Sequence, residues 1–302
     1  MQPGLRRIAP GVAQLTPAGP CSRHLREKMA VLACFADQAL VCAPAFDASP
    51  ALRAIAREVE PVESAPFRFD GPGDCHAPGL GWALDRHRPQ GQGDPGIGAL
   101  LGALPLDRRS AALLCLAFEE DFAVIDGDSA SIPWLAVCLP SRWAPEEKVG
   151  RHFAEVHAPV ADSAMLTAAS AQLTRLVTGS DRWERFVWTI SADPRLHQHP
   201  ARCDARWPEK ADAAELAALA SFRHEHQTFI PTGVGRQAVF TIRVFSEPLA
   251  SAVRTRDAAV RLHEALASMT PAVVAYRGLA PARDRLLDWL GQRMQDLPAV
   301  AA

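Results

Sequence analysis

The chain has 302 residues, 48% of them hydrophobic and 22% charged, which is typical of a globular protein with one large domain or two small ones. Its net charge of -2 argues against general attraction to nucleic acid or an anionic membrane. The sequence has no apolar run of about 18 residues, so it predicts no transmembrane helix. The seven widely spaced cysteines lack a C-x-x-C pair, which argues against a disulfide scaffold, a zinc ribbon and a cysteine-held iron–sulfur cluster.

The first third of the chain predicts helices around one short strand. Residues 1–20 show no regular pattern and no apolar signal segment, so we expect a loose tail and a cytoplasmic protein. Residues 24–35 and 49–60 have the apolar spacing of helices, and the apolar run between them predicts a strand. Residues 61–97 are rich in glycine, proline and aspartate, so we expect a long loop there.

The centre of the chain has clearer signals. Two strands are predicted at 122–127 and 134–140, joined by a turn. A helix is predicted at 144–157, where a proline and two glutamates mark its first turn. A second helix at 162–179 begins at a capping aspartate and ends at a glycine.

The remaining predicted elements complete a mixed fold. They are a strand at 185–191, a helix at 211–220, a β-hairpin at 222–245 and three helices, the last at 283–294. Strand pairs joined by short turns, with helices segregated around them, indicate an α+β fold. We expect one domain over residues 21–296, ending in a short tail at 297–302.

The hairpin FRHEHQTFIPTGVGRQAVFTIRVF has an unusual distribution of polar residues. With its turn at Thr-Gly-Val-Gly, Phe222 is expected opposite Phe245, and successive side chains alternate between two faces. One face would hold His224, His226, Thr241 and Arg243. The other would hold Arg223, Glu225 and Gln227 beside apolar residues of the returning strand. This second face fits either the wall of a pocket or an edge strand with solvated polar residues.

Three groups of histidines each allow two interpretations. His224 and His226 have a metal-ligand spacing on a strand, but the sequence supplies no third ligand, and two partly exposed histidines are the alternative. His157, at the end of a predicted helix, could cap that helix or serve as a single axial ligand to haem iron. His197 and His199 lie in a proline-flanked loop, which could hold a metal or be a polar surface loop.

Three segments, in order, resemble one known family. They are FEEDFAVIDGD at 118–128, AVCLPSRWAPEEKVGRHFAEVHAPV at 136–160 and FRHEHQTFIPTGVGRQAVFTIRVFSEPL at 222–249. Together they resemble the alpha-subunit family of haem-dependent oxidative N-demethylases, and the similarity extends over residues 65–290. The resemblance implies a PAS-like antiparallel sheet that holds b-type haem. It also implies O₂-dependent oxidation of a small secondary amine, such as dimethylamine, which releases formaldehyde.

The same resemblance implies the site residues and the partners. The implied cofactor-binding residues are Trp143, Lys148, His157, Gln227 and Thr241, with His157 as the iron ligand. The implied catalytic residues, which would anchor haem propionates or polarise the oxygen site, are Arg223, Glu225 and Arg243. Electrons would come from NADPH through separate reductase subunits that carry FMN and an iron–sulfur cluster.

The hairpin also departs from the family pattern. The family usually has arginine where this chain has His226 and tyrosine where it has Phe245. Two alternatives therefore stand beside the enzyme. One is a sensor that binds haem or another small ligand without turnover, and the other is a subunit that keeps the fold but no cofactor. Under all three we expect a bacterial, cytoplasmic protein that binds neither nucleic acid nor a membrane.

Overall fold

The computed structural model describes residues 4–9, 11–60, 65–157, 163–204 and 206–298. For His157 and for residues 163–169 it describes the backbone alone. Helices and antiparallel sheets are mixed along the chain, and the predicted α+β class is confirmed. Among the described residues, no helix combines the length and the apolar content needed to cross a membrane.

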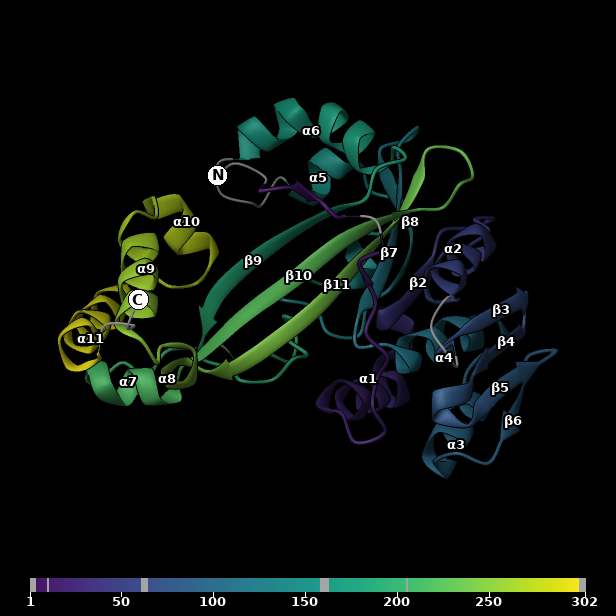
Figure 1. Ribbon diagram of the computed structural model, residues 1–302, viewed down its shortest axis with the longest axis horizontal. Helices are drawn as coiled ribbons and strands as arrows, with labels where there is room; N and C mark the ends of the chain where they lie inside the picture. Colours follow the sequence, from purple (N-terminus) through teal and green to yellow (C-terminus); the bar gives the residue numbers. More distant parts are fainter. Residues whose placement is uncertain (1–3, 10, 61–64, 158–162, 205, 299–302) are drawn as a thin grey trace.

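A long antiparallel sheet runs through the middle of the molecule (Figure 1). Within the described residues it has seven strands in the order β1-β9-β10-β11-β7-β8-β2. These strands are β1 (Arg6–Arg7), β2 (Leu40–Cys42), β7 (Asp121–Asp126), β8 (Ser131–Ala136), β9 (Trp183–Ser191), β10 (Ser221–Pro231) and β11 (Gln237–Pro248). The predicted hairpin and the central strand predicted at 122–127 are confirmed, whereas the strand predicted at 134–140 lies earlier, at Ser131–Ala136.

The register of the β10–β11 hairpin decides which side chains share a face. Phe222 lies opposite Glu247 rather than opposite Phe245, so the observed pairing differs by two residues from the predicted one. Because side chains alternate with a period of two, this shift leaves every predicted face unchanged. The turn uses Gly233 and Gly235, both at positive φ, a conformation that glycine adopts without steric cost.

The prediction of a long loop over 61–97 was wrong for the residues that are described. A second sheet occupies this region, with strands in the order β3 (Arg68–Gly71), β4 (Asp74–Ala77), β5 (Trp82–Asp85) and β6 (Arg88–Gly91). The strands are only four residues long, so the turn residues between them dominate the composition. At the β5–β6 turn, Arg86 and His87 both have positive φ, the geometry of a type I′ hairpin.

Three groups of helices surround the long sheet (Figure 1). At one end lie α1 (Arg23–Ala39), α2 (Ser49–Val59), α3 (Pro95–Ala103) and α4 (Arg109–Ala117). At the other end lie α7 (Ala213–Leu219), α8 (Leu249–Ala252), α9 (Arg256–Ala267), α10 (Pro271–Tyr276) and α11 (Arg283–Asp296). Beside the long sheet lie α5 (Phe153–His157) and α6 (Ser163–Val177). Short 3₁₀ turns occur at Pro78–Leu80, Leu106–Arg108 and Pro145–Glu147.

The single helix predicted at 144–157 was wrong in its middle. A 3₁₀ turn at Pro145–Glu147 and the helix α5 are separated by Gly150, which has φ +79°. An α-helix cannot continue through a left-handed residue, and the backbone N–H of Gly150 donates to Ile132 instead. This break places Ser141, Arg142 and Trp143 in an irregular connection rather than directly before a regular helix.

The expectation of a loose N-terminal tail was also wrong for the described residues before position 20. Strand β1 pairs with β9, and Pro17 forms a bridge with Phe118. Leu15 is buried, and the backbone N–H of Thr16 donates to the Glu120 carboxylate at 3.0 Å. Few apolar residues hold this segment, so the hydrophobic pattern gave no signal for it.

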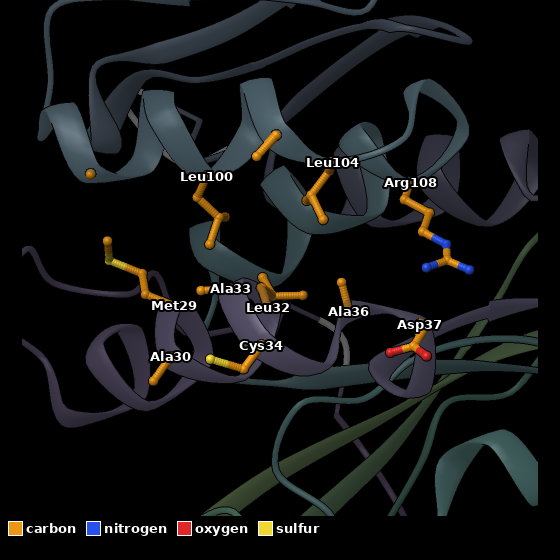
Figure 2. Close-up of a pocket in the computed structure, with 12 residues that line it drawn as sticks. Met29, Ala30, Leu32, Ala33, Cys34, Ala36, Asp37, Leu100, Leu104 and Arg108 are labelled. Carbon is orange, nitrogen blue, oxygen red and sulfur yellow. The ribbon is translucent and has the colours of Figure 1, made fainter.

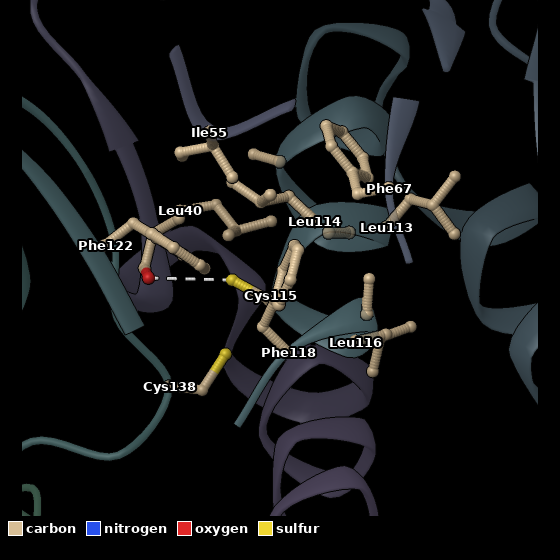
Figure 3. Close-up of a cluster of buried hydrophobic side chains, with 14 of the residues drawn as sticks. Leu40, Ile55, Phe67, Leu113, Leu114, Cys115, Leu116, Phe118, Phe122 and Cys138 are labelled. Atoms are coloured by element: carbon tan, nitrogen blue, oxygen red, sulfur yellow. Dashed lines mark hydrogen bonds between the residues drawn. The ribbon is translucent and has the colours of Figure 1, made fainter. Parts of the chain in front are cut away.

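Two apolar cores hold the molecule together. The larger one joins α1, α2 and α4 to the near side of the long sheet and to the small sheet, and Figure 3 shows its centre around α4. Every residue of α4 from Ser110 to Ala117 is buried there. The second core joins the C-terminal helices to Ile190 on β9. Between these cores, the middle of β9, β10 and β11 carries the polar side chains that form the site.

Candidate functional site

In its first half, strand β10 buries the polar side chains of one face and leaves the rings of the other face half buried. Arg223, Glu225 and Gln227 are buried, whereas Phe222 and His224, which alternate with them, are half buried. This distribution is the reverse of an ordinary half-buried strand, in which apolar residues face the core. The face that carries Glu225 is therefore the candidate site, and the edge-strand alternative does not apply, because β10 pairs on both sides.

Arg223 is a fully paired residue of this face. Its side chain is only 1% exposed, and its Nε donates to the Ser141 hydroxyl at 2.8 Å. Its terminal nitrogens donate to the backbone carbonyls of Leu139, Pro140, Arg195 and Leu196. Burial lowers the pKa of Arg223 to about 10, against the raising effect of the Glu225 charge. The guanidinium thus links two connecting segments, at residues 139–141 and 195–196, to β10.

Glu225 is the centre of a hydrogen-bonded chain. Because Ser141 accepts from Arg223, its hydroxyl proton is free to donate to Glu225 Oε1. The second carboxylate oxygen accepts from Gln227 Nε2 at 2.5 Å. Gln227 in turn accepts at Oε1 from Arg185 Nε, also at 2.5 Å. Two arginines therefore act on one carboxylate, each through a neutral intermediary.

The floor around Glu225 is apolar. Val187 on β9 and Val244 on β11 lie opposite Glu225 on its two sides, and Val244 is fully buried. Further along the same face lie Ile242 and Phe240, and Val177 of α6 packs near Phe240 in a small cluster with Phe229. A few placed polar groups on an apolar wall are typical of small-molecule and cofactor sites.

The end of α10 forms a rim along the outer edge of β9. Arg277 donates from Nη1 to the carbonyl of Trp188, and its own carbonyl accepts from Arg142 Nη1 at 2.9 Å. Trp207 donates to the carbonyl of Gly278 at 2.9 Å. Tyr276, just before this segment, has a pKa raised by burial and then by the negative charge of Glu225. The Tyr276 side chain is otherwise largely exposed, at 52%.

The other predicted residues of the hairpin lie on the opposite face. Thr241 is buried, and its hydroxyl shares a hydrogen bond of 2.6 Å with Thr228. Arg243 is held by Glu119 at 2.5 Å and lies over the ring of Phe245. The structure thus separates Arg243 and Thr241 from Glu225 by the thickness of the sheet.

The two hairpin histidines also lie on this opposite face. His226 Nε2 is 2.6 Å from Glu184, and its ring stacks on Phe186. His224 stacks on Phe245. Within the part of the chain that is described, neither histidine belongs to a group of three metal-ligating side chains.

Two predicted cofactor residues lie in the connection between β8 and α5. Trp143 packs against a cluster of Ala123, Leu135 and Val137, which adjoins Phe240 on the Glu225 face. Lys148 ends the 3₁₀ turn at Pro145–Glu147, where its backbone N–H donates to Pro145. Trp143 therefore shares the face of Glu225, but at a different end.

His157, the predicted iron ligand, is the last residue of α5. Its side chain lies outside the described residues, so its role stays a prediction. Its backbone position agrees with the site, because α5 packs beside α6 and the end of α6 contacts the Glu225 face. In Figure 1 both helices lie beside β9 and β8.

A second buried polar cluster lies beneath α4. Cys115, Asp121 and Cys138 place one ligand atom each within 4.8 Å of one another, a spacing that could hold a metal ion. Figure 3 shows the two cysteines side by side, with Cys115 donating to the carbonyl of Ala136. However, the ammonium of Lys28 is only 3.1 Å from Asp121. A cation is already in place there, so this donor set does not favour a metal.

An open groove lies between α1 and α3, away from the Glu225 face. It has a volume of about 630 Å³ and is lined by apolar residues such as Met29, Leu32 and Leu100. Asp37 and Arg108 lie together at one end of it (Figure 2). None of the residues predicted for the site lines this groove.

Two members of the site, Ser141 and Arg185, were not predicted from the sequence. Ser141 precedes Trp143 in the resembling segment, but nothing about a lone serine predicts a bond to a carboxylate. Arg185 could have been found, because β9 alternates and pairs with β10 so that Arg185 lies opposite Gln227. Pairing the strand at 185–191 with the hairpin would have brought this arginine to Glu225.

The fold and the site define a class: an α+β protein whose antiparallel sheet presents a buried carboxylate among apolar residues. A family comparison then identifies the chain within that class. Residues 103–287 match the family described as haem-dependent oxidative N-demethylase, alpha subunit-like, so the chain belongs to this family and the predicted resemblance is confirmed. The family's description names haem dependence and an alpha subunit, which implies an assembly of several subunits.

Proposed function

We propose that this chain is the haem-binding subunit of an oxidoreductase that uses O₂ to demethylate a small secondary amine. The proposal rests on family membership and on one observation, the buried carboxylate of Glu225 among apolar residues. Glu225 is 8% exposed and accepts two hydrogen bonds, from Ser141 and Gln227. Donors that favour the charged form of a carboxylate prepare it to receive an amine N–H.

The residues around Glu225 support the proposal of a haem group. The partly exposed Val187, backed by the buried Val244 and Ile242, would give a flat apolar ligand an apolar surface, and Arg185 would supply a cation for a carboxylate at its edge. We propose that His157 holds the iron and that the domain is PAS-like. In support of the latter, β7 and β8 lead through α5 and α6 into β9, β10 and β11 of one antiparallel sheet. Haem, when bound, would supply the oxygen chemistry.

This chain's own residues would bind and orient the amine. Glu225 would accept a hydrogen bond from the substrate nitrogen, while Ser141 and Gln227 keep the carboxylate oxygens in place. Val187, which is partly exposed beside Glu225, would help to exclude water and would contact the N-methyl groups. The electron donor would be a separate reductase subunit with FMN and an iron–sulfur cluster, in line with the subunit description of the family.

The first test is haem binding and the ligand assignment. Purified protein, reconstituted with haem b, is expected to show a Soret band that shifts on reduction and on addition of CO. His157→Ala should change this spectrum, whereas His152→Ala, five residues earlier and exposed, should not. An unchanged spectrum in His157→Ala would reject His157 as the ligand. No band in wild-type protein would favour the cofactor-free subunit.

The second test concerns Glu225. Dimethylamine is expected to perturb the spectrum of the wild-type protein, and the apparent Kd should rise about tenfold to a hundredfold in Glu225→Gln, as for a lost bond to a charged group. Formaldehyde release with a chemical reductant and O₂ should fall with it. Spectral perturbation without formaldehyde release would favour a sensor over an enzyme.

A further inference from the structure

The charges around Glu225 do not balance. Arg223 and Arg185 both act on this single carboxylate, through Ser141 and Gln227 respectively. The three side chains of this hydrogen-bonded chain, Arg223, Glu225 and Arg185, therefore carry one positive charge in excess. A partly buried excess charge is costly unless a counter-ion or solvent reaches it, so the position of the uncompensated cation shows where an anion is needed.

The uncompensated cation is Arg185. Arg223 is buried, and all three of its guanidinium nitrogens donate to protein oxygens. Arg185 uses only Nε, which donates to Gln227. Its terminal nitrogens, Nη1 and Nη2, have no hydrogen-bond partner in the part of the chain that is described, and they are not among the atoms sealed from solvent. The forked end of this guanidinium is thus open.

The surroundings hold this fork in one orientation. Arg185 is half buried on β9, and its Nε bond to Gln227 fixes the plane of the guanidinium. Burial lowers the pKa of Arg185, and the charge of Glu225 only partly offsets that effect.

The neighbouring arginines do not offer such a fork. Arg277 is bound to the carbonyl of Trp188 and lies over the Trp188 ring. Arg142 is bound to the carbonyl of Arg277, and its Nε and Nη2 are sealed from solvent. Of the four arginines around the Glu225 network in the described structure, Arg185 alone has two terminal nitrogens that are neither bonded to a described residue nor sealed from solvent.

We infer that Arg185 is the carboxylate-binding residue of this site. A planar guanidinium matches a carboxylate with two parallel hydrogen bonds, a geometry that lysine cannot reproduce. The inference rests on the proposed function, and the carboxylate has two sources. One is a propionate of haem. The other is the substrate itself, which would then be an N-methyl amino acid rather than dimethylamine.

The test compares wild-type protein with Arg185→Gln and Arg185→Lys. The matched control is Arg6→Gln, which removes an exposed arginine next to β9 that pairs with Glu184 on the opposite face. Binding of haem b and of haem dimethyl ester, in which both propionates are esterified, is measured by Soret titration. Binding of N-methylglycine and of dimethylamine is measured by calorimetry on the same proteins, with and without haem. Far-ultraviolet circular dichroism confirms that each variant is folded.

Two results support the inference. If the carboxylate is a propionate, Arg185→Gln weakens haem b about tenfold to a hundredfold but leaves the dimethyl ester unchanged. If the carboxylate belongs to the substrate, haem affinity is unchanged, and N-methylglycine loses the same factor while dimethylamine does not. In either case Arg185→Lys should fall between wild type and Arg185→Gln, and Arg6→Gln should behave as wild type.

Other results overturn it. If Arg185→Gln leaves haem b and N-methylglycine unaffected in their binding, or weakens haem dimethyl ester as much as haem b, Arg185 does not bind a carboxylate. If the wild-type protein takes up no haem, the proposed function fails. N-methylglycine binding to the haem-free protein then decides the role of Arg185 by itself: loss in Arg185→Gln supports it, and no binding to the wild-type protein rejects it.

Discussion

Two buried ion clusters in this molecule differ in whether they are complete. Lys28 is fully buried; its ammonium donates to the carbonyls of Phe118 and Glu120 and forms an ion pair of 3.1 Å with Asp121, so its charge has a counter-charge inside the protein. Arg185, beside Glu225, has one acceptor and an open fork. Both clusters place charge in a low-dielectric setting, where an unpaired group is costly. A complete cluster serves the fold, whereas an incomplete one indicates a place for a ligand.

The electrostatics of the two clusters agree with this distinction. Burial is the largest single effect on Lys28 and lowers its pKa, but the charge of Asp121 acts together with Cys115 and Cys138, and the combined effect leaves that pKa above its usual value. At Arg185, by contrast, burial prevails over Glu225, and the pKa is below its usual value. The protein thus compensates Lys28 entirely from within and Arg185 only in part.

The largest expected effect comes from breaking the complete cluster. Lys28→Met leaves Asp121 as a buried carboxylate without a counter-ion, and removing one member of a buried pair costs about 3–5 kcal/mol. Urea denaturation should show this loss as a lower transition midpoint. The double variant Lys28→Met with Asp121→Asn should recover part of the stability. A loss below about 1 kcal/mol would mean that the cluster is not structural.

A smaller effect is expected from the pH dependence of Glu120, which adjoins the complete cluster. Burial raises the pKa of Glu120 from 4.5 to about 7, although the Thr16 N–H bond and the charge of Lys28 act to lower it. The folded state therefore favours the protonated acid. The contribution of protonated Glu120 to the free energy of unfolding is present below pH 4.5. It is lost as the pH rises through 7, by about 3 kcal/mol in total.

Glu120→Gln tests this dependence, because the amide cannot ionise. Relative to the wild type, the variant should gain stability between pH 5 and pH 8, measured as the free energy of unfolding in urea at each pH. Asp128→Asn, an exposed carboxylate near the β7–β8 turn, provides the control and should not change the slope. A constant difference between Glu120→Gln and wild type across this range would contradict the prediction.

The smallest effect is expected at the incomplete cluster. Ser141→Ala removes the link between Arg223 and Glu225 and should cost about 1–3 kcal/mol of stability, the range for leaving a buried polar group unpaired. His226→Ala, on the opposite face, removes a partly exposed contact with Glu184 and should cost less than about 1 kcal/mol. Equal losses of stability in Ser141→Ala and His226→Ala would contradict the proposed difference between the two faces of β10.

The sequence predicted the two faces of the hairpin correctly, although its register was displaced by two residues. A pattern with a period of two survives such an error, because alternation and not exact pairing assigns a side chain to a face. The small sheet was missed for the converse reason. Its strands are so short that Gly73, Arg86 and His87, which make its turns, outweigh the strand residues in any window of sequence.

The chemistry of the site was predictable only in part. Glu225 and Gln227 stood out because they interrupt a strand, whereas Ser141 and Arg185 reach them across more than forty positions of chain. Arg243 looked similar to Arg223 in sequence, yet a single step of alternation sends it to Glu119 on the far side. Contacts that depend on the packing of three strands and a connection cannot be derived from the spacing of residues alone.

The contact between Arg277 and Trp188 has a further consequence for the behaviour of the chain in solution. In the described structure β1 pairs only with Trp183 and Glu184, so most of the nine-residue strand β9 has an open side. An open strand invites addition of a strand from another molecule and, through it, aggregation. Arg277 occupies one of the carbonyl groups that such a strand would need. Replacing this arginine would therefore expose the protein to self-association as well as altering the rim of its site.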